Sequence, residues 1–219
     1  MASVDPIRSL CGALTQATGG VYHVDLRMPD GIHRLAEVVD LLFGKRIVGA
    51  DVRERLTLHV PAAIMVLLAD PMGTYAKLAC ECFASVYPRV FLYASQDGSP
   101  ASFQLWQVVT AIKERVLFTL DDGTLGARIG AVKACQRIIQ AQPKPDGAPR
   151  LQTRAEINLN AVPPEHPFLK TEQLEAEADQ VFTRLITLLF TCKAPSLVMA
   201  VTQVLTRLAR LRTKLNKVV

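Results

Sequence analysis

Hydrophobic residues recur along most of the chain at intervals of three and four, the spacing of one face of an amphipathic helix. The clearest stripe predicts a helix over residues 101–120, and its apolar positions are Phe103, Trp106, Val109, Ile112, Val116 and Leu120. The same spacing predicts helices over residues 30–43, 74–93, 124–141, 172–191 and 195–215. No segment alternates polar and apolar residues over more than four positions, as a half-buried strand would. The chain is therefore predicted to be all-α.

Proline residues mark several boundaries of these helices. Asp5 and Pro6 have the order of a cap and a first helical residue, and they are expected to open a helix that runs to about residue 18. Pro61 is expected to break or restart a helix, because proline cannot donate a backbone hydrogen bond. Pro88 is expected to bend or end the helix over residues 74–93.

An internal repeat suggests how the helices are arranged. The stretches LLADPMGTYAKLACECFASVY and FTLDDGTLGARIGAVKACQRI align without gaps at a period of 51 residues, and Asp70 then matches Asp121 while Lys77 matches Arg128. The acidic residue is expected to cap the turn between two helices, and the basic residue to reach back toward such carboxylates. Small residues that follow the base let neighbouring helices approach closely. This pattern predicts a HEAT/ARM-like α-solenoid of stacked antiparallel helix pairs.

The repeat also divides the chain, which we expect to form one solenoid domain over residues 1–219. Residues 1–70 are expected to form degenerate capping repeats, and residues 71–141 hold the best repeats. A long loop between repeats over about 142–170 is expected to be ordered in part, and residues 171–219 form the last helix pair.

Composition narrows the possible functions. Half of the residues are hydrophobic and 6% are aromatic, which suits a core of aliphatic side chains between helices, and the net charge of +5 is a mild excess. The five cysteines have irregular spacing, and Cys80 and Cys82 would point about 200° apart on a helix, so we expect reduced core residues and no metal site. No signal peptide is visible, and no run of eighteen apolar residues could span a membrane.

No constellation of residues points to catalysis. The chain has no phosphate-binding loop and no H-E-x-x-H motif, and its four histidines are scattered. The carboxylates of Glu172, Glu175 and Glu177 fall in the first two turns of a predicted helix, where helix-terminal charge explains them. We therefore expect neither enzymatic activity nor a cofactor.

Two groups of basic residues are candidates for binding a partner. Arg207, Arg210, Lys214 and Lys217 share one face of the last helix. They form either a solvated helix face or a contact for an acidic protein or RNA, although no interleaved aromatic residue could stack on bases. Lys133 and Arg137 lie one helical turn apart, on a helix that would line the concave side of a solenoid, and could contact a partner or simply be solvated.

The segment INLNAVPPEHPFL, residues 157–169, cannot join either neighbouring helix because Pro163, Pro164 and Pro167 restrict it. We call it the strap. Its apolar residues should anchor it against the helical hairpins, whereas residues 143–154 should be mobile. His166 is expected to be a structural hydrogen-bonding group, and Trp106 to be buried between adjacent hairpins.

The strap and the helix after it, EINLNAVPPEHPFLKTEQLEAEADQVF, resemble the N-terminal domain of symplekin and its fungal counterparts. The resemblance continues in VYPRVF, WQVVTAIKERVL, ARIGAVKACQRIIQAQ and VLTRLARLR, and it covers roughly residues 75–219. This chain departs from the family where Thr213 follows Arg212, a position at which the family often has proline.

The resemblance implies a non-catalytic scaffold of the nuclear machinery that cleaves and polyadenylates pre-mRNA 3′ ends. It implies a HEAT domain that binds and stimulates a phosphatase of the RNA polymerase II C-terminal repeats, with other subunits of the complex as further partners. It also implies that the chain is a fragment or an unusually short relative, because the long C-terminal part of the family is missing.

Overall fold

The structure is a computed structural model that describes residues 28–44, 56–142 and 159–211, together with residues 12, 24 and 157. In these ranges the chain forms α2 (Gly31–Val39), a π-helical turn η1 (Asp40–Gly44), α4 (Val60–Leu67), α5 (Ala76–Gln96), α6 (Pro100–Asp122), α7 (Leu125–Ala141), a 3₁₀ turn η2 (Leu159–Ala161), α8 (Thr171–Thr191) and α9 (Pro195–Leu211). No strand occurs among them, which confirms the all-α prediction. The predicted helix over residues 5–18 lies outside the described residues.

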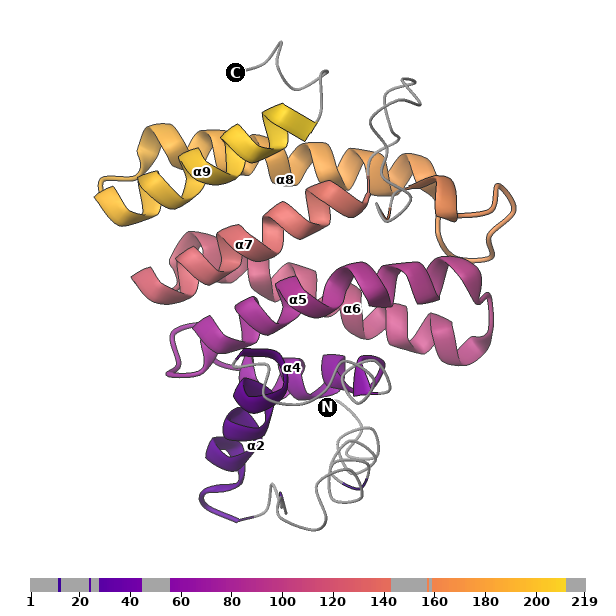
Figure 1. The fold of residues 1–219 in the computed structure, drawn as a ribbon, viewed down its shortest axis with the longest axis horizontal. Coiled ribbons are helices and arrows are strands. Elements are labelled where there is room, and N and C mark those ends of the chain that lie inside the picture. The colour runs from indigo at the N-terminus through magenta and orange to yellow at the C-terminus, as the bar shows by residue number, and fades with distance from the viewer. Residues whose placement is uncertain are drawn as a thin grey trace.

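The helices stack as antiparallel pairs, which confirms the solenoid prediction (Figure 1). In the view of Figure 1, α5, α7 and α9 form the front layer, and α6 and α8 lie behind them. The α4 helix packs against both α5 and α6 at the lower end of the stack, and α2 packs against α4.

Small residues allow the front layer to pack closely. Gly130 of α7 lies so near α5 that an added Cβ would be 3.0 Å from the carbonyl oxygen of Lys77 and 3.2 Å from Cβ of Cys80. By contrast, within the described part of the chain, α6 and α8 do not pack against each other along their lengths. The layer of α5, α7 and α9, called the inner layer below, is therefore the more closely packed of the two.

The turn between α6 and α7 corrects two sequence predictions. Thr124, rather than Asp121, caps α7, and its side chain accepts a hydrogen bond from the amide of Ala127. The α6 helix runs on to Asp122, so Asp121 lies in its last turn, 3.5 Å from Arg184 of α8. Arg128 forms no ion pair with a described carboxylate either, and its Nε instead donates to the carbonyl of Leu120 at 2.8 Å. That carbonyl belongs to the group of C-terminal carbonyls that a helix leaves unpaired.

Asp70, the repeat partner of Asp121, does not cap a helix either. Its Oδ1 accepts a hydrogen bond from the amide of Met72 at 2.9 Å, whereas α5 begins only at Ala76 and has no side-chain cap. The repeat therefore predicted two equivalent turns between helices correctly, but the capping roles predicted for Asp70 and Asp121 are wrong.

The core of the stack contains a row of aromatic rings. Phe83, Tyr87 and Phe91 follow one another along α5, and Phe91 contacts Trp106 of α6 with ring centroids 6.0 Å apart. Trp106 is 8% exposed. The α5 helix continues through Pro88 to Gln96, so of the two predicted alternatives, a bend or an end, Pro88 does not end the helix.

Three cysteines are buried in the same core, namely Cys80, Cys82 and Cys135. Burial raises the pKa of the Cys80 thiol to about 12, so this group is protonated and unreactive near neutral pH. No described helix is long and apolar enough to cross a bilayer.

Candidate binding surfaces and the buried ion pair

The basic pair predicted on α7 lies on the inner layer, but its two members have different surroundings. Lys133 forms an ion pair with Glu81 of α5, with Nζ 2.6 Å from Oε1. Arg137 is exposed and donates to Gln140 of its own helix, and it forms no ion pair with any described residue. Arg137 is therefore the member of the pair whose charge is available to a partner.

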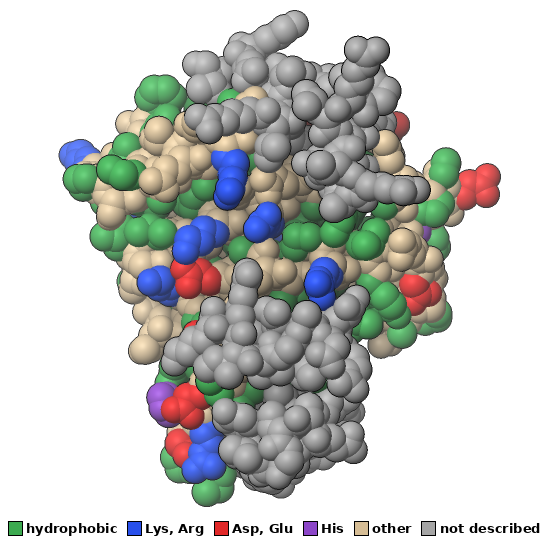
Figure 2. Space-filling view, viewed as in Figure 1, with side chains coloured by type: hydrophobic (Ala, Val, Ile, Leu, Met, Phe, Trp, Pro, Cys, Tyr) green, Lys and Arg blue, Asp and Glu red, His purple; other side chains and the backbone are tan. Residues whose placement is uncertain are grey.

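Other basic residues enlarge this surface. Lys77 and Arg89 of α5 are exposed, and they lie four residues before and eight residues after Glu81, on the same side of the helix. Figure 2 shows Lys and Arg side chains across the middle of the viewed face, over α5, α7 and α9, with acidic side chains among them. The sequence analysis did not identify Lys77 and Arg89 as candidates, although their helical spacing from Glu81 was the available signal.

Of the basic residues predicted on the last helix, Arg207 is exposed on α9. The side chain of Arg210 and the whole of Lys214 lie outside the described residues. The proposal of one continuous basic face on this helix therefore stays a prediction.

A buried ion pair joins α6 and α8, the two helices of the rear layer. Lys113 of α6 is 3% exposed, its Nζ lies 2.6 Å from Oε2 of Glu177 on α8, and it sits 4.8 Å from the centroid of the Trp106 ring. Gln142, which ends α7, donates its side-chain amide to the same oxygen of Glu177. The sequence analysis explained Glu177 as helix-terminal charge, and the structure shows instead that it pairs with a buried lysine.

Burial shifts the pKa values of ionisable groups in this cluster. Burial lowers the pKa of Lys113, and the carboxylate of Glu177 opposes that shift. The hydroxyl of Tyr87 is also buried and has no hydrogen-bond partner among the described residues. Burial, and then the charge of Glu177, raise the pKa of Tyr87. Four successive helices, α5 to α8, thus meet at one charged centre.

The described part of the strap packs on the hairpins, as its apolar residues predicted. Leu159, Val162 and Leu169 are buried in the main core. Pro167 lies against the turn between α5 and α6, where a Cβ on Gly98 would be 3.0 Å from Cγ of the proline. The strap therefore covers the end of the α5–α6 hairpin. Residues 143–154, predicted to be mobile, lie outside the described residues.

His166 fixes the turn of the strap that leads into α8. It is 4% exposed, its Nδ1 accepts a hydrogen bond from the amide of Leu169 at 3.1 Å, and its ring meets Phe168 edge to face at 4.5 Å. Burial lowers the pKa of His166, so the neutral ring that can accept this hydrogen bond is favoured. The neighbouring Pro163, Pro164 and Pro167 are exposed.

Phe103 does not join the buried stripe on which the sequence analysis placed it. Its side chain is 42% exposed and packs against Phe168 of the strap, with ring centroids 5.4 Å apart. The strap, which no periodicity could position, thus supplies the partner of this residue.

We find no further candidate site among the described residues. No group of three or more His, Cys, Asp or Glu side chains there is placed to hold a metal ion. The arrangement instead provides charged helical surfaces, a clamped connecting segment and a groove between α6 and α8.

Stacked helix pairs with one closely packed inner layer define the chain as an α-solenoid. Residues 74–219 match the family model described as Symplekin/PTA1 N-terminal, so the chain belongs to the symplekin/PTA1 family, and the resemblance found in its sequence is confirmed. Over 152 residues it is 28% identical to the mRNA cleavage and polyadenylation specificity factor complex subunit pta1 of Schizosaccharomyces pombe. That alignment covers 68% of this chain and 22% of the relative, so the chain spans about a fifth of the relative's length.

Proposed function

We propose that this chain is a scaffold segment of the mRNA 3′-end cleavage and polyadenylation machinery, acts in the nucleus and catalyses no reaction itself. The observation that carries the proposal is the family match over residues 74–219, which contains every helix from α5 to α9. The curated relative is named as a subunit of an mRNA cleavage and polyadenylation specificity factor complex. A solenoid suits such a role because its extended layers present long surfaces to partners.

The finer part of the proposal is that the layer of α5, α7 and α9 binds a phosphatase of the RNA polymerase II C-terminal repeats and stimulates it. The phosphatase comes from the family resemblance. Support from the geometry is limited to the exposed basic side chains on this inner layer, in particular Arg137 and Arg207. Lys133 contributes less free charge, since Glu81 already pairs with it.

A binding assay with the homologous phosphatase tests this proposal. We expect the 219-residue chain to retain the phosphatase at micromolar concentrations and Arg137→Glu to weaken retention by reversing an unpaired charge. Lys193→Glu is the matched control, because Lys193 is an exposed base in the connection between α8 and α9. Failure of the unaltered chain to retain the phosphatase would remove the finer proposal. Equal retention by both variants would place the interface elsewhere.

RNA binding through the last helix is the second candidate function. Arg207 is the member of that basic face whose exposed side chain is described. Because RNA affinity that rests on phosphate contacts falls steeply with salt, a titration at several salt concentrations separates it from protein binding. Undetectable RNA binding at low salt would eliminate this candidate.

A further inference from the structure

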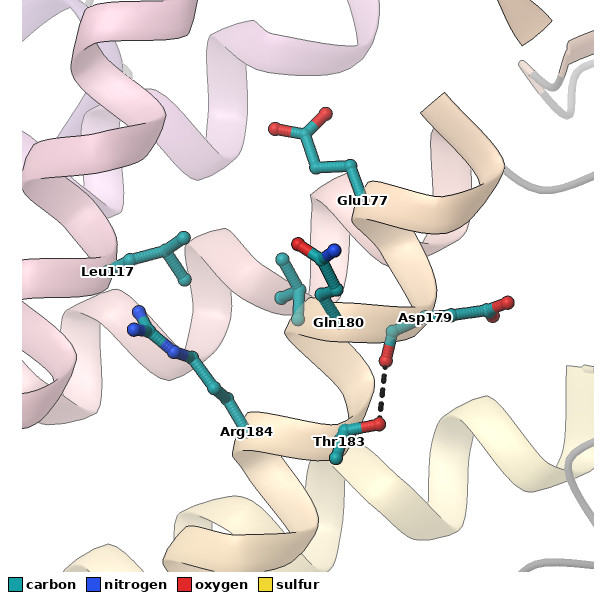
Figure 3. Close-up of a pocket in the computed structure, with 7 residues that line it drawn as sticks. Leu117, Glu177, Asp179, Gln180, Thr183 and Arg184 are labelled. Atoms are coloured by element: carbon teal, nitrogen blue, oxygen red, sulfur yellow. Dashed lines mark hydrogen bonds between the residues drawn. The ribbon is translucent and has the colours of Figure 1, made fainter. Parts of the chain in front are cut away.

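A groove lies between α6 and α8 (Figure 3). These two helices lie behind the layer of α5, α7 and α9 (Figure 1). It has a volume of about 510 Å³, and its lining residues are Leu117, Glu177, Asp179, Gln180, Val181, Thr183 and Arg184. The equivalent helices of the preceding pair, α4 and α6, pack directly against each other. The groove is therefore a local departure from the stacking seen lower in the solenoid.

Two ion pairs hold the walls of the groove without filling it. Lys113 and Glu177 bridge α6 and α8 at 2.6 Å, and Asp121 and Arg184 bridge them again two turns further along at 3.5 Å. Because the first pair is buried, it fixes the distance between the helices. The groove therefore exists before any partner arrives, and a partner would not have to open it.

Much of the groove wall is apolar. Leu117 of α6 faces α8 in Figure 3, and Val181 lines the groove from α8. The hydroxyl of Thr183 donates to the carbonyl of Asp179 in its own helix at 2.9 Å, so this residue needs no polar partner from outside. A partner could therefore bury apolar side chains here.

The segments of α6 and α8 that border the groove carry an acidic excess, whereas the whole chain is basic. Residues 110–122 and 172–184 hold seven carboxylates against three basic side chains, whereas the whole chain has a net charge of +5. Two of the three bases, Lys113 and Arg184, are already paired across the groove. Glu177 and Asp179 line the groove itself. The exposed Glu114 lies three residues before Leu117 on α6, on the same side of that helix.

We propose that this groove binds a basic amphipathic helix of a partner protein. Its apolar side chains would enter between α6 and α8, and its lysine or arginine side chains would face the carboxylates of the flanks. This is the general mode of a helix in a hydrophobic groove, with charge complementarity setting orientation and partner choice. The site does not depend on what occupies the layer of α5, α7 and α9, so the solenoid can hold two partners.

Two labelled peptides test the chemistry. Each is a helix of roughly 18 residues, about five turns, with leucine along one face and either lysine or glutamate elsewhere. Fluorescence anisotropy with the 219-residue chain should show binding of the lysine helix and none of the glutamate helix. Equal binding of both helices, or binding of neither, overturns the proposal.

Two variants locate the binding. Thr183→Trp fills the groove without changing charge, and Glu114→Lys reverses a flanking charge. Each is expected to weaken the lysine helix at least about tenfold, or ~1.4 kcal/mol. Glu165→Lys makes the same charge change on the exposed strap, outside the groove lining, and should leave affinity unchanged. Circular dichroism confirms that each variant is folded.

Unchanged affinity in both groove variants would overturn the proposal, because the peptide would then bind elsewhere. Sedimentation of the unaltered chain tests whether a second copy of the chain occupies the groove instead. If the chain associates with itself and Thr183→Trp abolishes that association, the groove is an interface between copies and the proposal of a basic partner helix is wrong.

Discussion

The buried pair of Lys113 and Glu177 should respond very differently to loss of its two members. Lys113 has 4% of its side chain exposed and Glu177 has 28%, so only the carboxylate can reach water. Glu177→Gln would leave a buried ammonium group without its counter-charge, and breaking such a pair costs about 3–5 kcal/mol. Lys113 could instead lose its proton. A lysine has a pKa of about 10.4 in water, so deprotonating it at pH 7 costs about 5 kcal/mol, and the loss of stability cannot exceed that value.

Lys113→Met should be far milder, at about 1 kcal/mol or less. The substitution removes the desolvation that lowers the pKa of Lys113, and it keeps an unbranched side chain beside Trp106. Glu177 would keep the hydrogen bond from Gln142 and its partial contact with water. The double variant, Lys113→Met with Glu177→Gln, should then be about as stable as Lys113→Met alone, because the carboxamide introduced at position 177 no longer faces a buried charge.

Urea unfolding followed by far-ultraviolet circular dichroism measures the four free energies of this cycle. The pH adds an independent check. Because the pKa of Lys113 is lower in the folded state than in the unfolded state, the unfolded state binds more protons just below pH 10.4. The free energy of unfolding therefore rises with pH in that range. The deficit of Glu177→Gln should therefore shrink toward pH 10. Equal costs for the two single variants, or a cost below about 1 kcal/mol for Glu177→Gln, would refute this reasoning.

Two further predictions concern the core and the strap. Trp106→Ala should lower the free energy of unfolding in urea by about 3–5 kcal/mol, because Trp106 packs on Phe91 in the core. Phe103→Ala, at a 42% exposed position, should cost clearly less. Similar costs for the two variants would contradict the assigned packing. Burial lowers the pKa of His166, so below its ordinary value of about 6.5 the unfolded state takes up the proton first and stability should fall as the pH falls. A protonated Nδ1 also cannot accept the hydrogen bond from Leu169, so amide exchange at Leu169, corrected for intrinsic rates, should accelerate below pH 6.5; pH-independent protection would contradict this account.

The helices could be predicted from the sequence because their apolar stripes are long. The stripe over residues 101–120 corresponds to α6 at Pro100–Asp122, and the one over 172–191 to α8 at Thr171–Thr191. Burial of one helix face against a neighbour is a local pattern that repeats every turn, so it is visible without the partner. The strap was predictable for a related reason, since prolines exclude it from helices and apolar residues require burial.

Contacts between distant segments could not be predicted in this way. Lys113 meets a carboxylate 64 residues away, and nothing near it in the sequence distinguishes it from a solvated lysine. Phe103 occupies a position on the apolar stripe, yet its contact is Phe168 of the strap rather than another helix of the stack. The capping role assigned to Asp121 failed because α6 extends through it, and helix ends are the least predictable part of a helical pattern.

The strap leads directly into α8, one of the two helices that border the groove. It covers the turn between α5 and α6, where Pro167 lies against Gly98, and α8 begins only after it. The α4 and α6 helices pack directly against each other. The α6 and α8 helices meet through the ion pairs of Lys113 with Glu177 and of Asp121 with Arg184 instead of through close packing. The hydrogen bond from Leu169 to His166 lies just before α8, so protonation of His166 should loosen the strap where it leads into that helix.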